Sequence, residues 1–165
     1  MTEPITPHLT PEQIKAIKLS SGQVAKIDAR DFVLVSNHTW HLDTSGYPRA
    51  NLKLNGKWSL TRLHRFLIDP LPGMFVDHID CDKLNNARSN LRVCTPAQSI
   101  ANIRKYAGRS TFKGVHWHKG AGKWMAQIKV SGRHKYLGLF DIEADAGAAY
   151  AAAAISTHGE FARIA

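Results

Sequence analysis

The sequence predicts an α+β protein, in which a β-rich N-terminal segment leads into a strand–loop–strand–helix element. A three-stranded antiparallel sheet with one packed helix is expected to follow. Three observations predict this fold. An Asn55-Gly56 pair separates two alternating stretches, which is typical of a tight hairpin. Two short apolar runs enclose a polar loop and end at a Thr-Pro helix start. Three strand-like segments precede an alanine-rich helix.

Composition limits the classes of protein that the chain can be. Its 165 residues are 44% hydrophobic and 21% charged, which is typical of a globular protein, and the net charge of +9 favours a polyanion such as nucleic acid. No apolar run of about 18 residues is present, so no membrane span is expected. The opening "MTEPITPHLTPEQ" lacks an apolar secretory core, so it is not expected to be a secretory signal and reads as a flexible lead-in. Cys81 and Cys94 form no CxxC motif and are expected to be reduced thiols.

The N-terminal part reads as strands from Gln23 to Leu63. "YPRANLKL" and "KWSLTRL" flank the Asn55-Gly56 turn, and "TRLHRFLI" then changes to helical spacing until "DPLPG" ends it. Alternation along the first strand places apolar and polar side chains on opposite faces. The polar face is either solvated or in contact with DNA. The apolar set is Ala50, Leu52 and Leu54, and the polar set is Arg49, Asn51 and Lys53.

The stretch from Val76 to Asn102 combines the residue types that phosphodiester hydrolysis requires. The strand "MFVDHI" places Asp77 and His78 at its end, on opposite faces, and "NLRVC" forms the second strand. A helix is expected from Thr95-Pro96 to about Lys105. Imidazole suits proton transfer, and carboxylate or amide oxygens suit Mg²⁺ or Mn²⁺. Taken singly, a histidine beside a strand is more often structural, and "DKLNN" is an ordinary turn.

Residues Leu63 to Asn102, "LHRFLIDPLPGMFVDHIDCDKLNNARSNLRVCTPAQSIAN", closely resemble the HNH endonucleases, particularly the phage and intron-encoded homing type. The resemblance implies a ββα-metal fold and a single divalent metal (Mg²⁺ or Mn²⁺). It also implies a protein encoded by a phage or mobile element that acts in the cytoplasm of a bacterial host cell. It implies that His78 is the general base, that Asp77 is a metal ligand and that Asn90 orients His78. Arg92 and Asn86 are expected to support the loop or to contact phosphate.

Position 99 departs from the family pattern. HNH endonucleases usually carry Gln-Asn where this chain has Gln98-Ser99, and that Asn completes the metal site. A serine hydroxyl is a shorter and poorer ligand; Ser99 could bind the metal through water, or Asn102 about one turn later could replace it. The alternative hypothesis is therefore a catalytically impaired DNA-binding protein on the same scaffold. Binding of structured RNA is a third possibility.

Residues Ser110 to Ile164 resemble the APETALA2-type DNA-binding domain, through "GVHWH", "YLGLF" and "EADAGAAYAAAAI". In that family a three-stranded sheet enters the major groove and a helix packs behind it. Asp141 is expected to cap the helix, with Ile142, Tyr150 and Ile155 as its larger packing residues. His or Lys stands at several positions that are Arg in plant members, so we expect backbone anchoring with modest sequence preference.

These expectations give the chain four parts: a flexible lead-in (1–18), an HNH nuclease domain (19–105, core 63–105), a linker (106–111) and an APETALA2-like domain (112–165). The expected partner is double-stranded DNA, with no membrane and no obligate protein partner. The residues expected to contact DNA are basic, aromatic or amide side chains of both domains. They are Arg49, Lys53, Arg65, Arg88, Arg92, Lys113, His116, Trp117, His118, Lys123, Gln127, Lys129, His134 and Tyr136.

Overall fold

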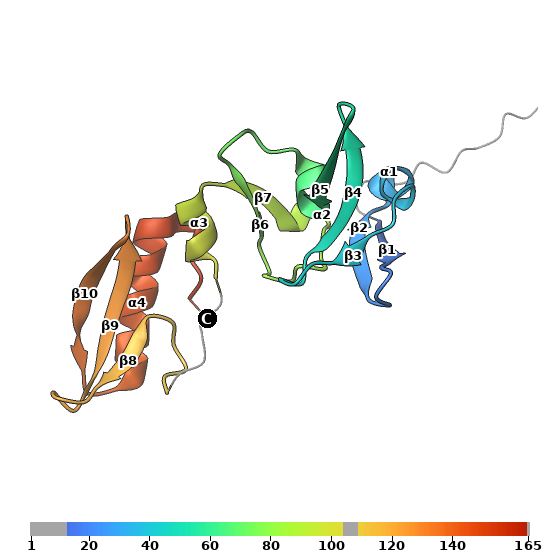
Figure 1. The fold of residues 1–165 in the computed structure, drawn as a ribbon. Coiled ribbons are helices and arrows are strands. Elements are labelled where there is room, and N and C mark those ends of the chain that lie inside the picture. The colour runs from blue at the N-terminus through green and yellow to red at the C-terminus, as the bar shows by residue number, and fades with distance from the viewer. Residues whose placement is uncertain (1–12, 104–108, 165) are drawn as a thin grey trace, which may run out of the picture. The chain divides into compact units, whose positions relative to one another are not determined.

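The computed structural model describes residues 13–103 and 109–164 and has the α+β composition expected from the sequence. The chain divides into two compact units, Met1–Val93 and Cys94–Ala165, coloured blue to green and yellow to red in Figure 1. The division falls before the helix of the strand–loop–strand–helix element, and so earlier than the linker predicted at 106–111. Within the described residues no helix is both long and apolar enough to cross a membrane.

The first unit begins with an antiparallel pair of strands, β1 and β2. The prediction of a flexible lead-in over 1–18 is wrong for Ile14–Lys18, because this segment is β1 and its Ile17 side chain is buried in the core. The strand-like interpretation of residues 23–63 also missed a short helix, α1. The elements are β1 (Ile14–Lys18), β2 (Val24–Asp28), the 3₁₀ turn η1 (Ala29–Asp31) and α1 (Phe32–Ser36).

A second sheet of the first unit, in the order β3-β4-β5, contains the predicted hairpin. Asn55 and Gly56 have φ values of 49° and 80°, the left-handed conformation that this turn requires at both positions. Ala50 and Leu52 are buried as the alternation predicted, whereas Leu54 beside the turn is 40% exposed. The strands are β3 (His41–Leu42), β4 (Pro48–Leu54) and β5 (Lys57–Arg62).

The last elements of the first unit are a short helix and a two-stranded sheet, as predicted. Helix α2 (Leu63–Ile68) buries Leu63 and Leu67 and ends at Asp69 in the left-handed conformation. Both strands contribute to the core of the unit through Val76 and Leu91. The remaining elements are β6 (Phe75–His78), η2 (Arg88–Asn90) and β7 (Leu91–Cys94).

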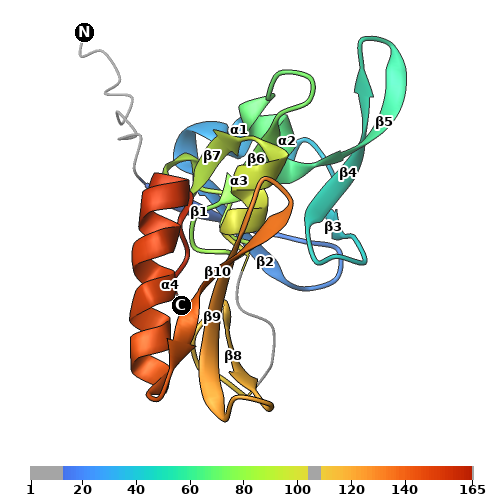
Figure 2. The same ribbon diagram turned by 90° about the vertical axis from the view of Figure 1, so that its left-hand side faces the viewer.

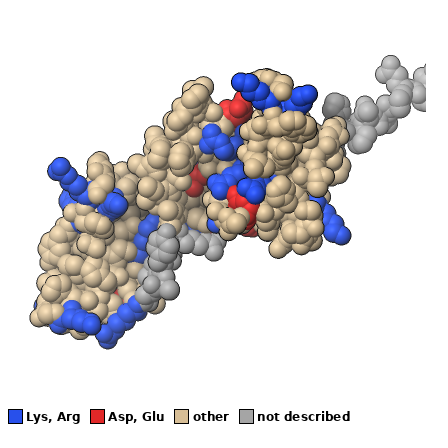
Figure 3. Space-filling model, in the orientation of Figure 1, with Lys and Arg blue, Asp and Glu red and all other residues tan. Residues whose placement is uncertain are grey.

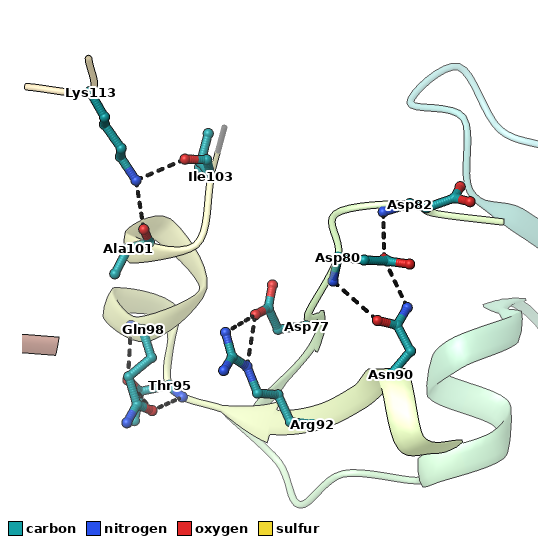
Figure 4. Close-up of polar contacts among 10 residues, drawn as sticks. All are labelled: Asp77, Asp80, Asp82, Asn90, Arg92, Thr95, Gln98, Ala101, Ile103 and Lys113. Carbon is teal, nitrogen blue, oxygen red and sulfur yellow. Dashed lines mark hydrogen bonds and ion pairs between the residues drawn. The ribbon is translucent and has the colours of Figure 1, made fainter. Parts of the chain in front are cut away.

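The second unit starts with helix α3 (Pro96–Ala101), whose N-terminus has the predicted cap. The Thr95 side chain accepts from the Gln98 backbone N–H, and the Gln98 side chain accepts from the Thr95 N–H. Helical structure ends at Ala101, before the predicted end near Lys105, which itself lies outside the described residues. The Lys113 ammonium donates to the carbonyls of Ala101 and Ile103, at 2.6 and 2.8 Å, and so holds the end of the helix (Figure 4).

The rest of the second unit is the predicted three-stranded antiparallel sheet, covered on one face by helix α4, as Figure 2 shows. Small residues let the helix lie close to its neighbours: a Cβ on Gly147 would lie 2.6 Å from the Phe112 ring. The elements are β8 (Val115–His118), β9 (Lys123–Val130), β10 (Arg133–Phe140), α4 (Glu143–His158) and η3 (Gly159–Phe161).

Two details of the predicted C-terminal helix are wrong. Ile142, not Asp141, occupies the cap position, and no side chain caps the helix there. Of the three larger packing residues, Tyr150 is buried, but Ile142 and Ile155 are 60% and 58% exposed. The buried face consists instead of Ala146, Gly147, Tyr150 and Ala154, because small side chains allow the closest approach of the helix to the sheet.

Candidate active site and nucleic-acid interface

The two residues expected to do the chemistry, Asp77 and His78, end strand β6 and are both buried, with 9% and 5% of their surface exposed. Their neighbours differ because adjacent residues of a strand point to opposite faces. Asp77 contacts Arg92 of the paired strand β7, whereas His78 lies against Asn86 and a group of rings. The strand therefore presents a carboxylate and an imidazole to two different environments.

The protonation pattern of the His78 ring follows from its hydrogen bond to Asn86. The Nε2 of His78 lies 3.3 Å from the Oδ1 of Asn86. The Asn86 Nδ2 donates to the Lys83 carbonyl at 3.1 Å, which can only accept, and this fixes Oδ1 toward the imidazole. Nε2 must then be the protonated nitrogen, and Nδ1 of the neutral ring carries the lone pair. The ring is therefore set to accept a proton at Nδ1.

The charge state of His78 is set by opposing effects. Burial lowers its pKa from the ordinary value. The hydrogen bond to Asn86 and the nearby carboxylates of Asp80 and Asp77 act in the opposite direction, without cancelling the effect of burial. The imidazole is therefore neutral near pH 7, which is the form that a general base requires.

Asp77 forms an ion pair with Arg92 that is largely removed from solvent. Arg92 donates from Nε and Nη2 to the Asp77 Oδ2, at 3.1 and 3.0 Å (Figure 4). The Asp77 side chain is 11% exposed and the Arg92 side chain is 13% exposed. Arg92, expected to support the loop or to contact DNA, thus orients the carboxylate across the two-stranded sheet.

Asn90 anchors the loop that follows β6. Its Oδ1 accepts from the Asp80 backbone N–H at 3.1 Å, and its Nδ2 donates to the Asp80 carboxylate at 2.9 Å (Figure 4). Nδ2 also donates to the Asn85 carbonyl at 2.8 Å. Burial would raise the pKa of Asp80, but hydrogen bonds, the largest from the Asn85 side chain, lower it below its usual value. The His78 Nε2–H donates to Asn86, whereas Asn90, which was expected to orient that ring, bonds to Asp80 and Asn85.

The predicted ligands after β7 lie on helix α3, which belongs to the second unit. Gln98 is committed to the capping box with Thr95. Ser99 is half-buried, and Asn102 is the C-terminal cap residue, with only 4% of its surface exposed. Ser99 therefore lies within the helix, and Asn102 follows its last residue.

The donor atoms available suit a hard divalent cation better than zinc. No group of three or more His, Cys, Asp or Glu side chains that could hold an ion is present in the described part of the chain. Mg²⁺ does not require such a group, because it keeps several waters and binds through one or two carboxylates and substrate phosphate. The Asp77 carboxylate, with water and substrate phosphate, fits this pattern, and Cys81 and Cys94 do not form a disulfide.

The outer face of the C-terminal sheet, opposite helix α4, collects seven of the residues expected to contact DNA. Ala126 and Ile128 are buried against α4, so alternate positions along β9 face outward. The strand register pairs Met125 with His116 and Lys129 with His134 on that face. The seven residues are His116, His118, Lys123, Gln127, Lys129, His134 and Tyr136. Lys123 also forms an exposed ion pair with Asp141.

Other residues expected to contact DNA are engaged inside the protein. Arg88 donates twice to the buried Asp31, at 2.9 Å, and this bond raises the pKa of the guanidinium. Trp117 packs against Trp124 with ring centroids 5.2 Å apart. Arg49 donates to His41, Arg65 to the Met74 carbonyl and Lys113 to the end of α3. Lys53 is exposed on β4, opposite Trp58.

Two ring residues beside His78 were not identified from the sequence. The His64 and His78 ring centroids are 5.1 Å apart, and Tyr47 lies 5.1 Å from His64 and 5.8 Å from His78. Tyr47 lies in a turn and His64 in α2, so no local motif links them to the His78 strand. Only the tertiary structure brings them together.

Residues 70–99 match the HNH endonuclease family. An uncharacterized HNH endonuclease of Acanthamoeba polyphaga mimivirus is 37% identical over 87 residues, 49% of this chain and 44% of the relative. Protein 3.8 of Escherichia phage T7 is 33% identical over 66 residues, 39% of this chain and 54% of the relative. A solved structure describing DNA binding and cleavage by the HNH homing endonuclease I-HmuI is 21% identical, with a TM-score of 0.36 over 53% of this chain and 56% of that chain.

The match to the HNH family contains Asp77, His78, Asn90 and Ser99. The segment that carries the buried carboxylate and imidazole is therefore the segment that matches the HNH endonuclease family. The chain spans about half the length of the curated relatives it matches. The resemblance of residues 110–164 to the APETALA2-type domain stays a prediction.

Proposed function

We propose that this protein is an HNH-type DNA endonuclease that hydrolyses phosphodiester bonds with a single divalent cation, Mg²⁺ or Mn²⁺. The observation that carries the proposal is the end of β6, where Asp77 and His78 are adjacent in sequence and both buried. His78 is held by Asn86 in the form that leaves the lone pair on Nδ1. Such an arrangement is suited to activating water beside a phosphate.

In this proposal His78 is the general base. Its Nδ1 takes a proton from a water molecule, the water oxygen forms a bond to phosphorus, and the bond between phosphorus and the leaving sugar oxygen breaks. Asp77, oriented by Arg92, supplies a carboxylate for the cation. When bound, the cation would stabilise negative charge on the leaving oxygen. Asn90 holds the loop that begins directly after His78.

The outer face of the C-terminal sheet is proposed to hold the duplex. Its lysines can bind phosphates, its histidines and Gln127 can reach base edges, and Tyr136 is 59% exposed. On the molecular face shown in Figure 3, Lys and Arg side chains are more widespread than Asp and Glu, in agreement with the net charge of +9. We expect contacts to phosphate to dominate affinity.

The test is nicking of supercoiled plasmid by the full chain, with Mg²⁺ or Mn²⁺ and with a chelator as blank. His78→Ala should abolish nicking while DNA binding persists. His38→Ala is the matched control, because His38 is an exposed histidine of the same unit. Nicking by His78→Ala at the wild-type rate would overturn the proposed role of His78.

A second candidate function, DNA binding without cleavage, is favoured by the serine at position 99 of α3. A hydroxyl is a poorer neutral ligand for Mg²⁺ than an amide oxygen, so the cation could be bound too weakly for turnover. Ser99→Asn distinguishes the two functions in the same assay. If the wild type binds DNA without nicking and Ser99→Asn nicks, the second function is correct and the loss is confined to one residue.

A further inference from the structure

Three rings form a cluster around the end of β6: Tyr47, His64 and His78. His64 and His78 meet edge to face, with 81° between their planes and 5.1 Å between centroids. Tyr47 is tilted by 60° to His64 and by 43° to His78. Such arrangements are the preferred contacts of aromatic rings and restrict their rotation. His78 is thus packed by two rings in addition to its hydrogen bond to Asn86.

His64 contributes to this cluster through its ring and not through a hydrogen bond at Nδ1. Its side chain is buried, with 4% of its surface exposed, and Nδ1 is a buried nitrogen for which the described residues provide no hydrogen-bond partner. Burial, with His78 and Arg62 nearby, lowers the pKa of His64 to about 3, so the ring is neutral. A buried polar atom without a partner is uncommon in folded proteins and calls for an explanation.

Tyr47 is held in place independently of His78. The Asp43 carboxylate accepts hydrogen bonds from the backbone of Ser45 and Tyr47, at 2.8 and 3.0 Å, and fixes the turn that carries the ring. The Arg62 guanidinium and the Lys83 ammonium lie 4.4 and 4.8 Å from the ring centroid. Arg62 is itself paired with Asp43 at 2.7 Å. The Tyr47 ring is therefore a fixed surface against which the other two rings pack.

We propose that Tyr47 and His64 are positioning residues that hold the His78 imidazole in the plane in which its Nδ1 can receive the proton of the attacking water. The inference rests on the proposed function. The hydrogen bond to Asn86 fixes the direction of Nε2. The two neighbouring rings pack against the imidazole and restrict its tilt about that direction. A displacement of about 1 Å at a reacting group can lower a rate about a hundredfold.

Four full-length variants test the proposal. Tyr47→Leu removes a ring, and Tyr47→Phe keeps it and removes only the hydroxyl. His64→Leu removes the second ring, and Val33→Ala, at a site 73% exposed in the same unit, reports the effect of an unrelated substitution. Single-turnover plasmid nicking gives the rate of the bound complex and a binding assay gives the affinity for DNA, while urea unfolding identifies any variant that fails to fold.

We expect Tyr47→Leu and His64→Leu each to lower the single-turnover rate about tenfold or more without weakening DNA binding. Tyr47→Phe should keep most of the rate. The second readout is the nitrogen NMR spectrum of the His78 ring in the metal-free protein, which should show one tautomer, with Nε2 protonated, in the wild type and in Tyr47→Phe. In the two leucine variants these ring signals should shift or broaden.

Failure of this inference differs from failure of the proposed function. If the wild type nicks DNA and both leucine variants match its rate with unchanged His78 signals, the positioning role is wrong and the nuclease stands. If neither the wild type nor any variant nicks DNA, the proposed function fails. The nitrogen spectrum of His78 then decides alone whether the Tyr47 and His64 rings set the geometry of the His78 ring. Equal losses in Tyr47→Phe and Tyr47→Leu would also overturn the proposal, because the hydroxyl would then be responsible.

Discussion

At the scale of single residues, the orientation of one amide determines how His78 can act. Asn86 is fully buried, donates to the Lys83 carbonyl and turns its oxygen toward the imidazole. Sequence reasoning proposes His78 and Asp77 for the chemistry, because their residue types and strand-end position suit hydrolysis. It could not assign the ring's partner between Asn86 and Asn90, since both lie in the same polar segment and only the path of the loop separates their roles.

The buried His64 predicts a dependence of stability on pH. Its pKa is about 3 in the folded protein, against 6.5 for the exposed group, so between these values the unfolded chain binds a proton that the folded chain does not. The free energy of unfolding should therefore be fully retained above about pH 6.5 and fall as pH decreases toward 3, by at most about 1.4 kcal/mol per pH unit from this group. His78 acts in the same direction.

Urea unfolding of the wild type and of His64→Leu at several pH values between about 7 and 4.5 would measure this contribution. This range extends to either side of the pKa of a free histidine, about 6.5. The slope of the free energy of unfolding against pH should be smaller in the variant. Parallel slopes would show that His64 is already protonated in the folded chain or is reached by solvent.

At the scale of elements, local signals predicted most of the segments but not all of their ends. The Thr95-Pro96 start of α3 and the Asn55-Gly56 turn were predicted because their causes lie within a few residues. Strand β1 was missed because it is recognisable only by its pairing with β2. The buried face of α4 was assigned to large side chains, whereas close packing against Phe112 and the sheet requires small ones.

Gly114, just before β8, should be essential to the packing of α4 on the sheet. It has a φ of +70°, and an added Cβ would overlap the Tyr150 ring and lie 2.6 Å from the Gln127 carbonyl oxygen. Gly114→Ala should lower the free energy of unfolding by about 1–3 kcal/mol. Gly132→Ala separates backbone strain from overlap, because Gly132 has a φ of +82° with nothing within 4 Å of an added Cβ.

Chemical unfolding monitored by circular dichroism provides the comparison between the two glycine variants. The expected order of stability is wild type, then Gly132→Ala, then Gly114→Ala. Equal losses in the two variants would mean that the positive φ alone accounts for the effect and that the overlap with Tyr150 is relieved at no cost.

At the scale of the whole molecule, charge and alternation predicted a nucleic-acid partner and much of the outer face of the C-terminal sheet. Sequence reasoning could not tell which basic residues are engaged within the fold. Arg88 pairs with Asp31, and the backbone carbonyls that Lys113 binds belong to the preceding helix. The partners of Arg88 and Lys113 lie elsewhere in the chain and cannot be recognised from the local sequence. Basic character alone therefore indicates nucleic-acid contact equally for basic residues that are engaged within the fold and for those that are exposed.

Lys129 and Lys113 should differ in their effect on DNA binding. Lys129 is exposed on the outer face of the sheet, whereas the Lys113 ammonium is bound to two carbonyls. Lys129→Ala should weaken binding and lower the slope of log affinity against log salt by about 0.9, the value for one lost phosphate contact. Lys113→Met should leave the salt slope unchanged. Titration of a labelled duplex at several salt concentrations measures the affinity and the salt slope of each variant. A reduced slope in Lys113→Met alone would show that Lys113, and not Lys129, contacts phosphate.

Nicking and DNA binding measured together, for the wild type and His78→Ala in Mg²⁺ or Mn²⁺ and with equal amounts of folded protein, decide whether His78 takes part in cleavage. We expect the wild type to convert supercoiled plasmid to the nicked form, and His78→Ala to bind the same DNA with the same affinity and leave it intact. Equal nicking by both proteins would mean that the imidazole at the end of β6 has no part in the cleavage.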